Sequence, residues 1–207
     1  YDKVRDKIVV RLVNRAANQS LLEEIPFVPF LDLAIIFHVL IKVDEQMVSM
    51  LITNEHLKMW NASVDSMYCS ALYNSERLLP AELTSMLMIV DELLPEDIRL
   101  EVDKEEDYMY VLTNDRRTFG GSTILYPDKL KYIGMYLKEN YYVLPSSVHE
   151  VIIVPESKAI GKEELKMMVY EINHTEVSKE ERLSDNVYYY DITFNFSPKR
   201  QNILLLG

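Results

Sequence analysis

The chain has 207 residues, of which 48% are hydrophobic and 27% charged. This balance is typical of a folded globular protein with a sizeable core, and it excludes an intrinsically disordered chain. The formal net charge of −11 disfavours a surface that binds nucleic acid or anionic lipid. A single cysteine, Cys69, excludes an intrachain disulfide and a multi-cysteine metal site.

The first residues and the hydrophobic runs indicate the compartment. The charged N-terminus lacks the apolar stretch of a secretory signal, and the run from Leu33 to Ile41 is too short for a membrane span of about 20 residues. We therefore expect a cytoplasmic protein that contacts no membrane. Because the chain starts with Tyr1 rather than Met, we expect it to be a fragment of a longer protein.

The first half of the chain combines a long strand with helices. Helical spacing of apolar residues predicts a helix over about residues 2–17. Between residues 31 and 43 hydrophobic side chains recur at every second position, which predicts a long strand followed by a second one over 47–53. Residues 55–94 are predicted to form two or three helices, the last of which begins at Pro80.

Asp and Glu are concentrated in residues 91–107, which indicates a solvated junction between two halves. We therefore predict two lobes. The N-terminal lobe, residues 1–95, holds the first helix, the β-hairpin and the helical segment. Residues 96–107 form an acidic connector, and residues 108–207 form a C-terminal α+β lobe.

The second half of the chain is richer in strands. The pattern predicts a hairpin of strands 108–113 and 123–126, a helix from Pro127, strands 141–144 and 150–154, a helix over 162–173 and a strand over 187–191. Hairpins interleaved with helices favour an α+β fold with mixed, mostly antiparallel sheets over a doubly wound parallel sheet.

Several short phrases along the chain are distinctive when taken together. They are Arg11-Leu-Val-Asn, Phe30-Leu-Asp-Leu-Ala, Thr53-Asn-Glu-His-Leu, Tyr110-Val-Leu-Thr-Asn, Leu144-Pro-Ser-Ser-Val-His-Glu-Val and Leu183-Ser-Asp-Asn-Val-Tyr-Tyr-Tyr-Asp. In this order, and over nearly the whole chain, they resemble a family of bacterial proteins that is common in gut clostridia and catalogued as a domain of unknown function. The resemblance implies a cytosolic bacterial protein with a further region before Tyr1. It implies no catalytic residue, cofactor or partner.

The segment Ser146-Ser147-Val148-His149-Glu150 is the most polar stretch between two predicted strands. Serine, histidine and a carboxylate are the nucleophile, base and orienting group of many hydrolases. Ser147 and His149 are only two positions apart, however, and the sequence has no G-x-S-x-G turn. The alternative interpretation is a hairpin turn whose serines bond the local backbone, with His149 at the start of the next strand.

A second polar segment, Asn54-Glu55-His56, directly follows a predicted strand. Together with His149 and Glu150 it offers two histidines and two glutamates, which could bind a divalent metal if the segments met in space. Two histidines at the spacing of a helical metal motif are absent. The alternative interpretation is a helix capped by Asn54, with Trp60 packed inward.

Other polar residues suggest structural roles. His38 is predicted to be a hydrogen-bonded histidine in or near the core, and Cys69 an inert thiol packed in a helix. The pair Arg116-Arg117, beside Gly120-Gly121, could hold an anion on a loop or could belong to an ordinary surface turn.

Two functions remain open at this point. The first is a non-enzymatic binding or regulatory module that takes a protein partner or a small ligand, uses no cofactor, and binds neither nucleic acid nor membrane. It is motivated by the lack of a spaced catalytic motif and by the tyrosine-rich strands. The second is a hydrolase or metal-dependent enzyme that uses six residues, Glu55, His56, Ser146, Ser147, His149 and Glu150. The identity of the ligand and the oligomeric state are left open.

Overall fold

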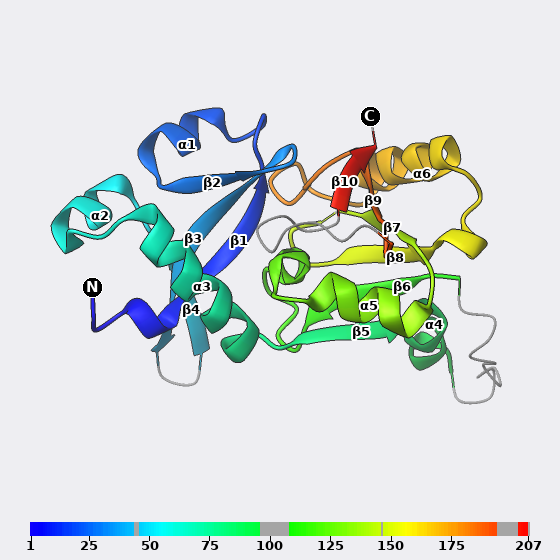
Figure 1. The fold of residues 1–207 in the computed structure, drawn as a ribbon, viewed down its shortest axis with the longest axis horizontal. Helices are drawn as coiled ribbons and strands as arrows, with labels where there is room; N and C mark the ends of the chain where they lie inside the picture. The colour runs from blue at the N-terminus through cyan, green and yellow to red at the C-terminus, as the bar shows by residue number, and fades with distance from the viewer. Residues whose placement is uncertain (44–45, 96–107, 146, 194–202, 207) are drawn as a thin grey trace.

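The computed structural model describes residues 1–43, 46–95, 108–145, 147–193 and 203–206. Two β-sheets with helices on their faces make up this part of the chain (Figure 1). Every strand pair in both sheets is antiparallel. This architecture confirms the predicted α+β class with mostly antiparallel sheets.

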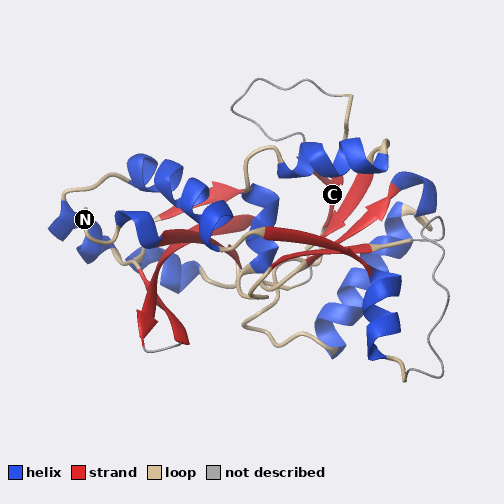
Figure 2. Ribbon diagram, turned by 90° about the horizontal axis from the view of Figure 1, so that it is seen from below, coloured by secondary structure: helices blue, strands red, loops and turns tan. Residues whose placement is uncertain are grey.

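The first sheet is built on one long central strand. Its members are β1 (Ile8–Asn14), β2 (Phe27–Phe30), β3 (Leu33–Val43) and β4 (Gln46–Leu51). β1 pairs along one edge of β3, while β2 and β4 pair with successive parts of the other edge. β3 confirms the strand predicted from the two-residue rhythm, and its far end continues with β4 as a projecting ribbon (Figure 2).

Helices pack on both faces of the first sheet. They are α1 (Gln19–Glu24), α2 (Asn54–Trp60) and α3 (Val64–Leu78). α3 packs Met67 against the face that carries Leu12 of β1, and α1 packs Leu22 against the opposite face, which carries Ile36 of β3. Because successive side chains of a strand point to opposite faces, apolar residues at both odd and even positions become buried.

The second sheet has the strand order β10-β9-β7-β8-β6-β5. Its strands are β5 (Ala81–Ser85), β6 (Tyr110–Asn114), β7 (Tyr141–Leu144), β8 (Val151–Pro155), β9 (Val187–Tyr190) and β10 (Ile203–Leu206). The helical elements of this half are α4 (Met86–Leu93), α5 (Lys129–Leu137), α6 (Lys162–Thr175) and the short 3-10 segments η3 (Gly120–Leu125) and η4 (Glu156–Lys158). Leu130 of α5 packs in the cluster of Tyr141, and Leu165 of α6 packs with Leu144 on the other face.

The buried core runs without interruption from the first sheet to the second. At the junction the backbone N–H of Leu12 donates to Ser122 Oγ at 2.9 Å, and Asn186 Nδ2 donates to Asp32 Oδ2 at 3.0 Å. The hydroxyl of Tyr188 also donates to this carboxylate. Division into two lobes is therefore not confirmed. The boundaries at residues 95 and 108 stay a prediction, and the connector 96–107 lies outside the described residues.

The predicted helix over residues 2–17 is wrong, because the centre of this segment forms β1. Five of the seven positions of β1 carry Ile, Val or Leu, and all five are buried. A strand that is buried on both faces has apolar residues at nearly every position and so fits a helical spacing as well as an alternating one. Only a 3-10 turn, η1 (Arg5–Lys7), precedes it.

Two further predictions are corrected in the second half. The helix expected from Pro80 is strand β5 followed by α4, which starts where Ser85 Oγ accepts the backbone N–H of Met88. The strand expected over 123–126 falls mostly in η3, a turn buried throughout its length. In both cases local preference gives way to tertiary contact, since β5 pairs with β6 and η3 packs against the segment before β8.

Candidate functional site

Three segments that are far apart in the sequence meet around one open cavity, which we call the His149 pocket. The cavity has a volume of about 400 Å³. Its polar lining comes from Arg117, Ser147, His149, Glu150, Glu176 and Glu181. These residues lie in the loop after β6, the loop between β7 and β8, and the segment that follows α6. The pocket is therefore a product of the tertiary fold.

A pair of glycines allows the floor of the pocket to form. A Cβ on Gly120 would lie 2.1 Å from the carbonyl oxygen of His149, and one on Gly121 would lie 2.7 Å from that of Ser147. The close approach is fixed by two hydrogen bonds. Thr113 Oγ1 donates to the carbonyl of His149 at 2.7 Å, and the N–H of Gly121 donates to that of Val148 at 3.1 Å. Glycine is thus required where η3 meets the loop before β8.

A buried asparagine holds the loop that carries Arg117. Asn114 is 0% exposed. Its Oδ1 accepts the backbone N–H groups of Arg116 and Thr118, and its Nδ2 donates to the carbonyl of Thr118 at 2.7 Å. Within this turn Arg117 has a φ of 50°, a left-handed conformation that is uncommon for residues other than glycine. The side-chain network of Asn114 keeps the backbone in this conformation and places Arg117 at the pocket.

Glu181, in the segment that follows α6, also lines the pocket. The backbone N–H of Val148 donates to its carbonyl at 2.8 Å, which ties this segment to the loop before β8. Its carboxylate accepts Ser178 Oγ at 3.0 Å and lies 3.3 Å from His149 Nε2. These hydrogen bonds, first that of Ser178 and then that of His149, lower the pKa of Glu181. Glu181 is therefore an ionised carboxylate at neutral pH.

Ser147 and His149 come together in the pocket without forming a nucleophile and its base. Ser147 is 5% exposed, and its Oγ accepts the backbone N–H of His149 at 3.0 Å. The ring of His149 faces Glu181 with Nε2, while its Nδ1 is buried and has no hydrogen-bond partner among the residues that the structure describes. In the described segments no hydrogen bond joins Ser147 Oγ to this ring. Glu150 is half-buried at the rim, and Ser146 lies outside the described residues.

The second predicted segment lies elsewhere. Glu55 and His56 begin α2, toward one end of the molecule, and neither lines the His149 pocket (Figure 1). Thr53, not Asn54, caps this helix: its Oγ1 accepts the N–H of His56 at 3.4 Å, and its own N–H donates to His56 Nδ1 at 3.0 Å. The His56 ring stacks on Trp60, which is half-buried.

Metal ligation gains no support from this placement. Among the residues that the structure describes, no group of three or more His, Cys, Asp or Glu side chains could hold a metal ion. The two histidines of the predicted metal set instead have local partners, Thr53 for His56 and Glu181 for His149.

Behind the pocket lies a buried group that sequence reasoning did not connect to it. His38 is 6% exposed, and its ring centroid is 5.1 Å from that of Phe119. The guanidinium of Arg11 lies 4.9 Å from the centroid of the Phe119 ring. Burial, and then the charge of Arg11, lower the pKa of His38 to about 4, so the ring is neutral at pH 7. His38 is buried as predicted, but within the described part of the chain neither ring nitrogen has a hydrogen-bond partner.

Arg11 links this buried group to the wall of the pocket. Burial lowers the pKa of Arg11, and the charge of Glu181 opposes that effect. Arg11 and Glu181 carry no local sequence signal, because they reach the site through strand pairing and through the contact of residues 181–182 with the loop before β8. Cys69 also departs from its prediction, since its thiol is exposed rather than packed.

The sequence model of a family described as a family of unknown function, DUF5688, matches residues 1–192. The chain belongs to this family. The match confirms the resemblance noted in the sequence, and it covers every residue of the His149 pocket. No curated protein and no solved structure matches the chain. No helix in the described part of the chain has the length and apolar character needed to span a membrane.

Proposed function

We propose that the protein is a non-enzymatic binding module whose His149 pocket takes a small zwitterionic ligand, one that carries an amine and a carboxylate, as an amino acid does. The observation that carries this proposal is that Arg117 and three glutamates, Glu150, Glu176 and Glu181, line one cavity. A single ligand that carries both charges complements both kinds of side chain.

The charges of the lining favour an amine at one side. Three glutamates and one arginine line the pocket, so the acidic side chains outnumber the basic one. The lowered pKa of Glu181 keeps that carboxylate ionised. A ligand ammonium group among these carboxylates would make charge-assisted hydrogen bonds, which are stronger than neutral ones.

Arg117 favours a carboxylate at the other side. A guanidinium presents paired N–H donors that match the two oxygens of a carboxylate. The network of Asn114 already fixes the backbone of Arg117, so little ordering of that loop is required when a ligand binds. The volume of about 400 Å³ lies at the small end of the range for ligand pockets and suits a molecule of amino-acid size.

The arrangement of Ser147 supports binding over hydrolysis. A serine nucleophile has its hydroxyl on the histidine ring that removes its proton. Ser147 Oγ instead accepts a backbone N–H, and its residue is 5% exposed. The carboxylate partner of His149 also lies at the open pocket rather than behind the ring, where an orienting group would be.

We also propose that the module works in the bacterial cytoplasm. The family resemblance supports a bacterial source, and the exposed free thiol of Cys69 suits a reducing compartment.

Calorimetric titration with the common L-amino acids tests the proposed function. We expect at least one to bind, and we expect Glu181→Gln and Arg117→Gln each to weaken binding by about ten-fold or more. Glu180→Gln and Arg116→Gln are matched controls, because these neighbours do not line the pocket, and they should leave the affinity unchanged. Equal losses in the control variants, or no binding by any amino acid, would contradict the proposal.

Recovery of the unchanged ligand tests the claim that the protein binds it without catalysing a reaction. After prolonged incubation with the protein, chromatography should return the bound amino acid, and dipeptides made from it, unchanged. Turnover that is lost in Ser147→Ala would instead favour the hydrolase alternative.

A further inference from the structure

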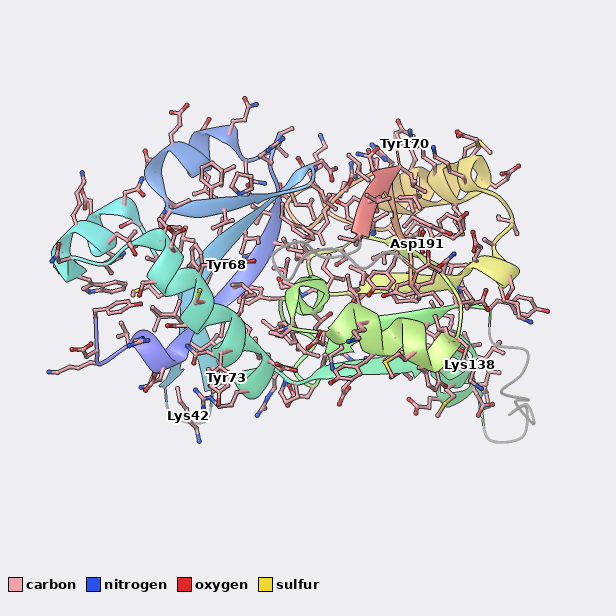
Figure 3. All side chains as sticks on the ribbon, viewed as in Figure 1. Lys42, Tyr68, Tyr73, Lys138, Tyr170 and Asp191 are labelled. Carbon is pink, nitrogen blue, oxygen red and sulfur yellow. The ribbon has the colours of Figure 1, made fainter. Side chains whose placement is uncertain are left out.

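A second cavity lies on the other half of the molecule, between η1 and α3. It has a volume of about 580 Å³, and we call it the Arg5–Arg77 groove. Arg5 comes from η1 and Arg77 from the last turn of α3. Asp6 of η1 and Cys69 and Tyr73 of α3 also line the groove. Figure 3 shows Tyr73 on the same helix, away from the second sheet.

Neutral oxygen atoms hold both guanidinium groups in place. Arg5 Nε donates to Ser70 Oγ at 3.1 Å, and Arg77 Nη2 donates to the backbone carbonyl of Asp6 at 2.8 Å. The buried side chain of Asn74 fixes the turn between them, since its Nδ2 donates to the carbonyl of Arg5 at 2.7 Å and to that of Ile8 at 3.0 Å. Two cationic groups are thereby fixed at one groove without a carboxylate as acceptor.

The described lining of the groove holds two arginines and one acidic residue, Asp6, so its net charge is +1. A guanidinium has five N–H donors, and each of these groups uses one of them in the hydrogen bonds above. No carboxylate of the described residues lies within 4.0 Å of either guanidinium. This is unusual in a protein whose net charge is −11, because acidic side chains outnumber basic ones.

We propose that the Arg5–Arg77 groove is a binding site for a small organic oxyanion, with a phosphate or carboxylate group held between the two guanidinium groups. An oxyanion bound there would accept the unused N–H donors of both guanidinium groups. The ring of Tyr73, which is 67% exposed, offers a flat wall for the group attached to the anion. The site is separate from the His149 pocket and does not depend on the function proposed for it.

Cys69 provides the test, because it is the only cysteine of the chain, is exposed, and lines this groove. Its alkylation rate is measured with anionic iodoacetate and with neutral iodoacetamide, and the ratio of the two rates reports the local attraction for an anion. We expect the double variant Arg5→Gln/Arg77→Gln to lower this ratio by about three-fold or more. Arg15→Gln is the matched control, since Arg15 is exposed and does not line the groove.

Competition on the unaltered protein does not depend on the folding of a variant. Inorganic phosphate, adenosine monophosphate, acetate or benzoate is added at millimolar concentration, with chloride at the same ionic strength as the reference. If inorganic phosphate and adenosine monophosphate slow the alkylation of Cys69 by iodoacetate, the ligand is a phosphate. If acetate and benzoate slow it, the ligand is a carboxylate. The proposal would be overturned by equal alkylation rates with all four anions and chloride, or by an unchanged rate ratio in a folded double variant. The two arginines would then serve only to hydrogen-bond η1 to α3.

Discussion

The two cavities of this protein differ in charge and in what supports them. The His149 pocket has a negative lining and is assembled from three distant segments over a buried support of Asn114 and the Gly120 turn. The Arg5–Arg77 groove has a positive lining and lies between η1 and α3 at the surface. The comparison teaches that the net charge of a chain does not describe its local sites. It also predicts that the pocket depends on the stability of the core far more than the groove does.

The largest effect is expected when the support of the His149 pocket is overpacked. In Gly120→Ala the new Cβ would lie 2.1 Å from the carbonyl oxygen of His149 and 2.2 Å from Thr113 Oγ1, so backbone must move. We expect a loss of about 3 kcal/mol in the free energy of unfolding. Urea denaturation measures it, with Gly161→Ala as a comparison, because the Cβ added there would meet only the side chain of Glu164 and Gly161 is half-buried with a φ of 120°. A loss below that of Gly161→Ala would show that the close approach is not a constraint.

Removal of the side chain that holds the Arg117 loop is expected to cost slightly less. Asn114→Ala removes the partner of the backbone groups of Arg116 and Thr118 and truncates a side chain that is 0% exposed. We expect a loss of about 2–3 kcal/mol in the free energy of unfolding, together with loss of amino-acid binding. The iodoacetate to iodoacetamide ratio at Cys69 should be unchanged in the folded variant. A change in that ratio in the folded Asn114→Ala variant would contradict the claim that the two cavities are independent.

A pH-dependent effect is expected from the buried ring of His38. The unfolded chain takes up this proton at the ordinary pKa of 6.5, whereas the folded protein does so at about 4, so stability is lost as the pH falls through this window. Between pH 7 and pH 5 the unaltered protein should lose about 2 kcal/mol more than His38→Phe does. Urea denaturation at each pH measures the difference, with the exposed His174→Gln as control. Identical pH profiles for His38→Phe and the unaltered protein would contradict a neutral, buried His38.

The smallest effect on stability is expected at the groove. Arg77→Gln removes one exposed charge and one hydrogen bond to the carbonyl of Asp6. We expect a change below about 0.5 kcal/mol in the free energy of unfolding, because surface substitutions rarely exceed that. Thermal denaturation beside Arg15→Gln checks it. A loss as large as that of Asn114→Ala would mean that the arginine is a structural support rather than a free ligand-binding group.

β1 and β3 are both buried on both faces, but they differ in length and in pattern. β3 was predicted because one of its faces is apolar at every second position while His38 and Lys42 lie on the other, and α6 has its inward residues at helical spacing. β1 was missed because it is short and apolar at nearly every position, so its spacing fits a helix as well as a strand. β5 was missed because its partner β6 lies beyond α4 and the acidic segment, and no local feature reports a pairing over that distance.

The site was predicted only in part, for the same reason. His149 and Glu150 stood out as a polar turn between two strands, and Arg117 stood out beside the glycine pair. Glu181 and Arg11 could not be associated with them, since each lies in an ordinary local context and reaches the pocket through tertiary contacts. Asn114 resembles any strand-end asparagine in the sequence, and only its burial reveals that it supports the loop.

The most direct test of the zwitterion-binding pocket changes the ligand rather than the protein. The amino acid that binds most tightly is compared by calorimetry with its amide, which lacks the carboxylate, and with its N-acetyl derivative, which lacks the ammonium group. If Arg117 and the facing glutamates each hold one end of the ligand, both derivatives should bind about ten-fold or more weakly than the parent. Affinities equal to that of the parent for either derivative would contradict the account.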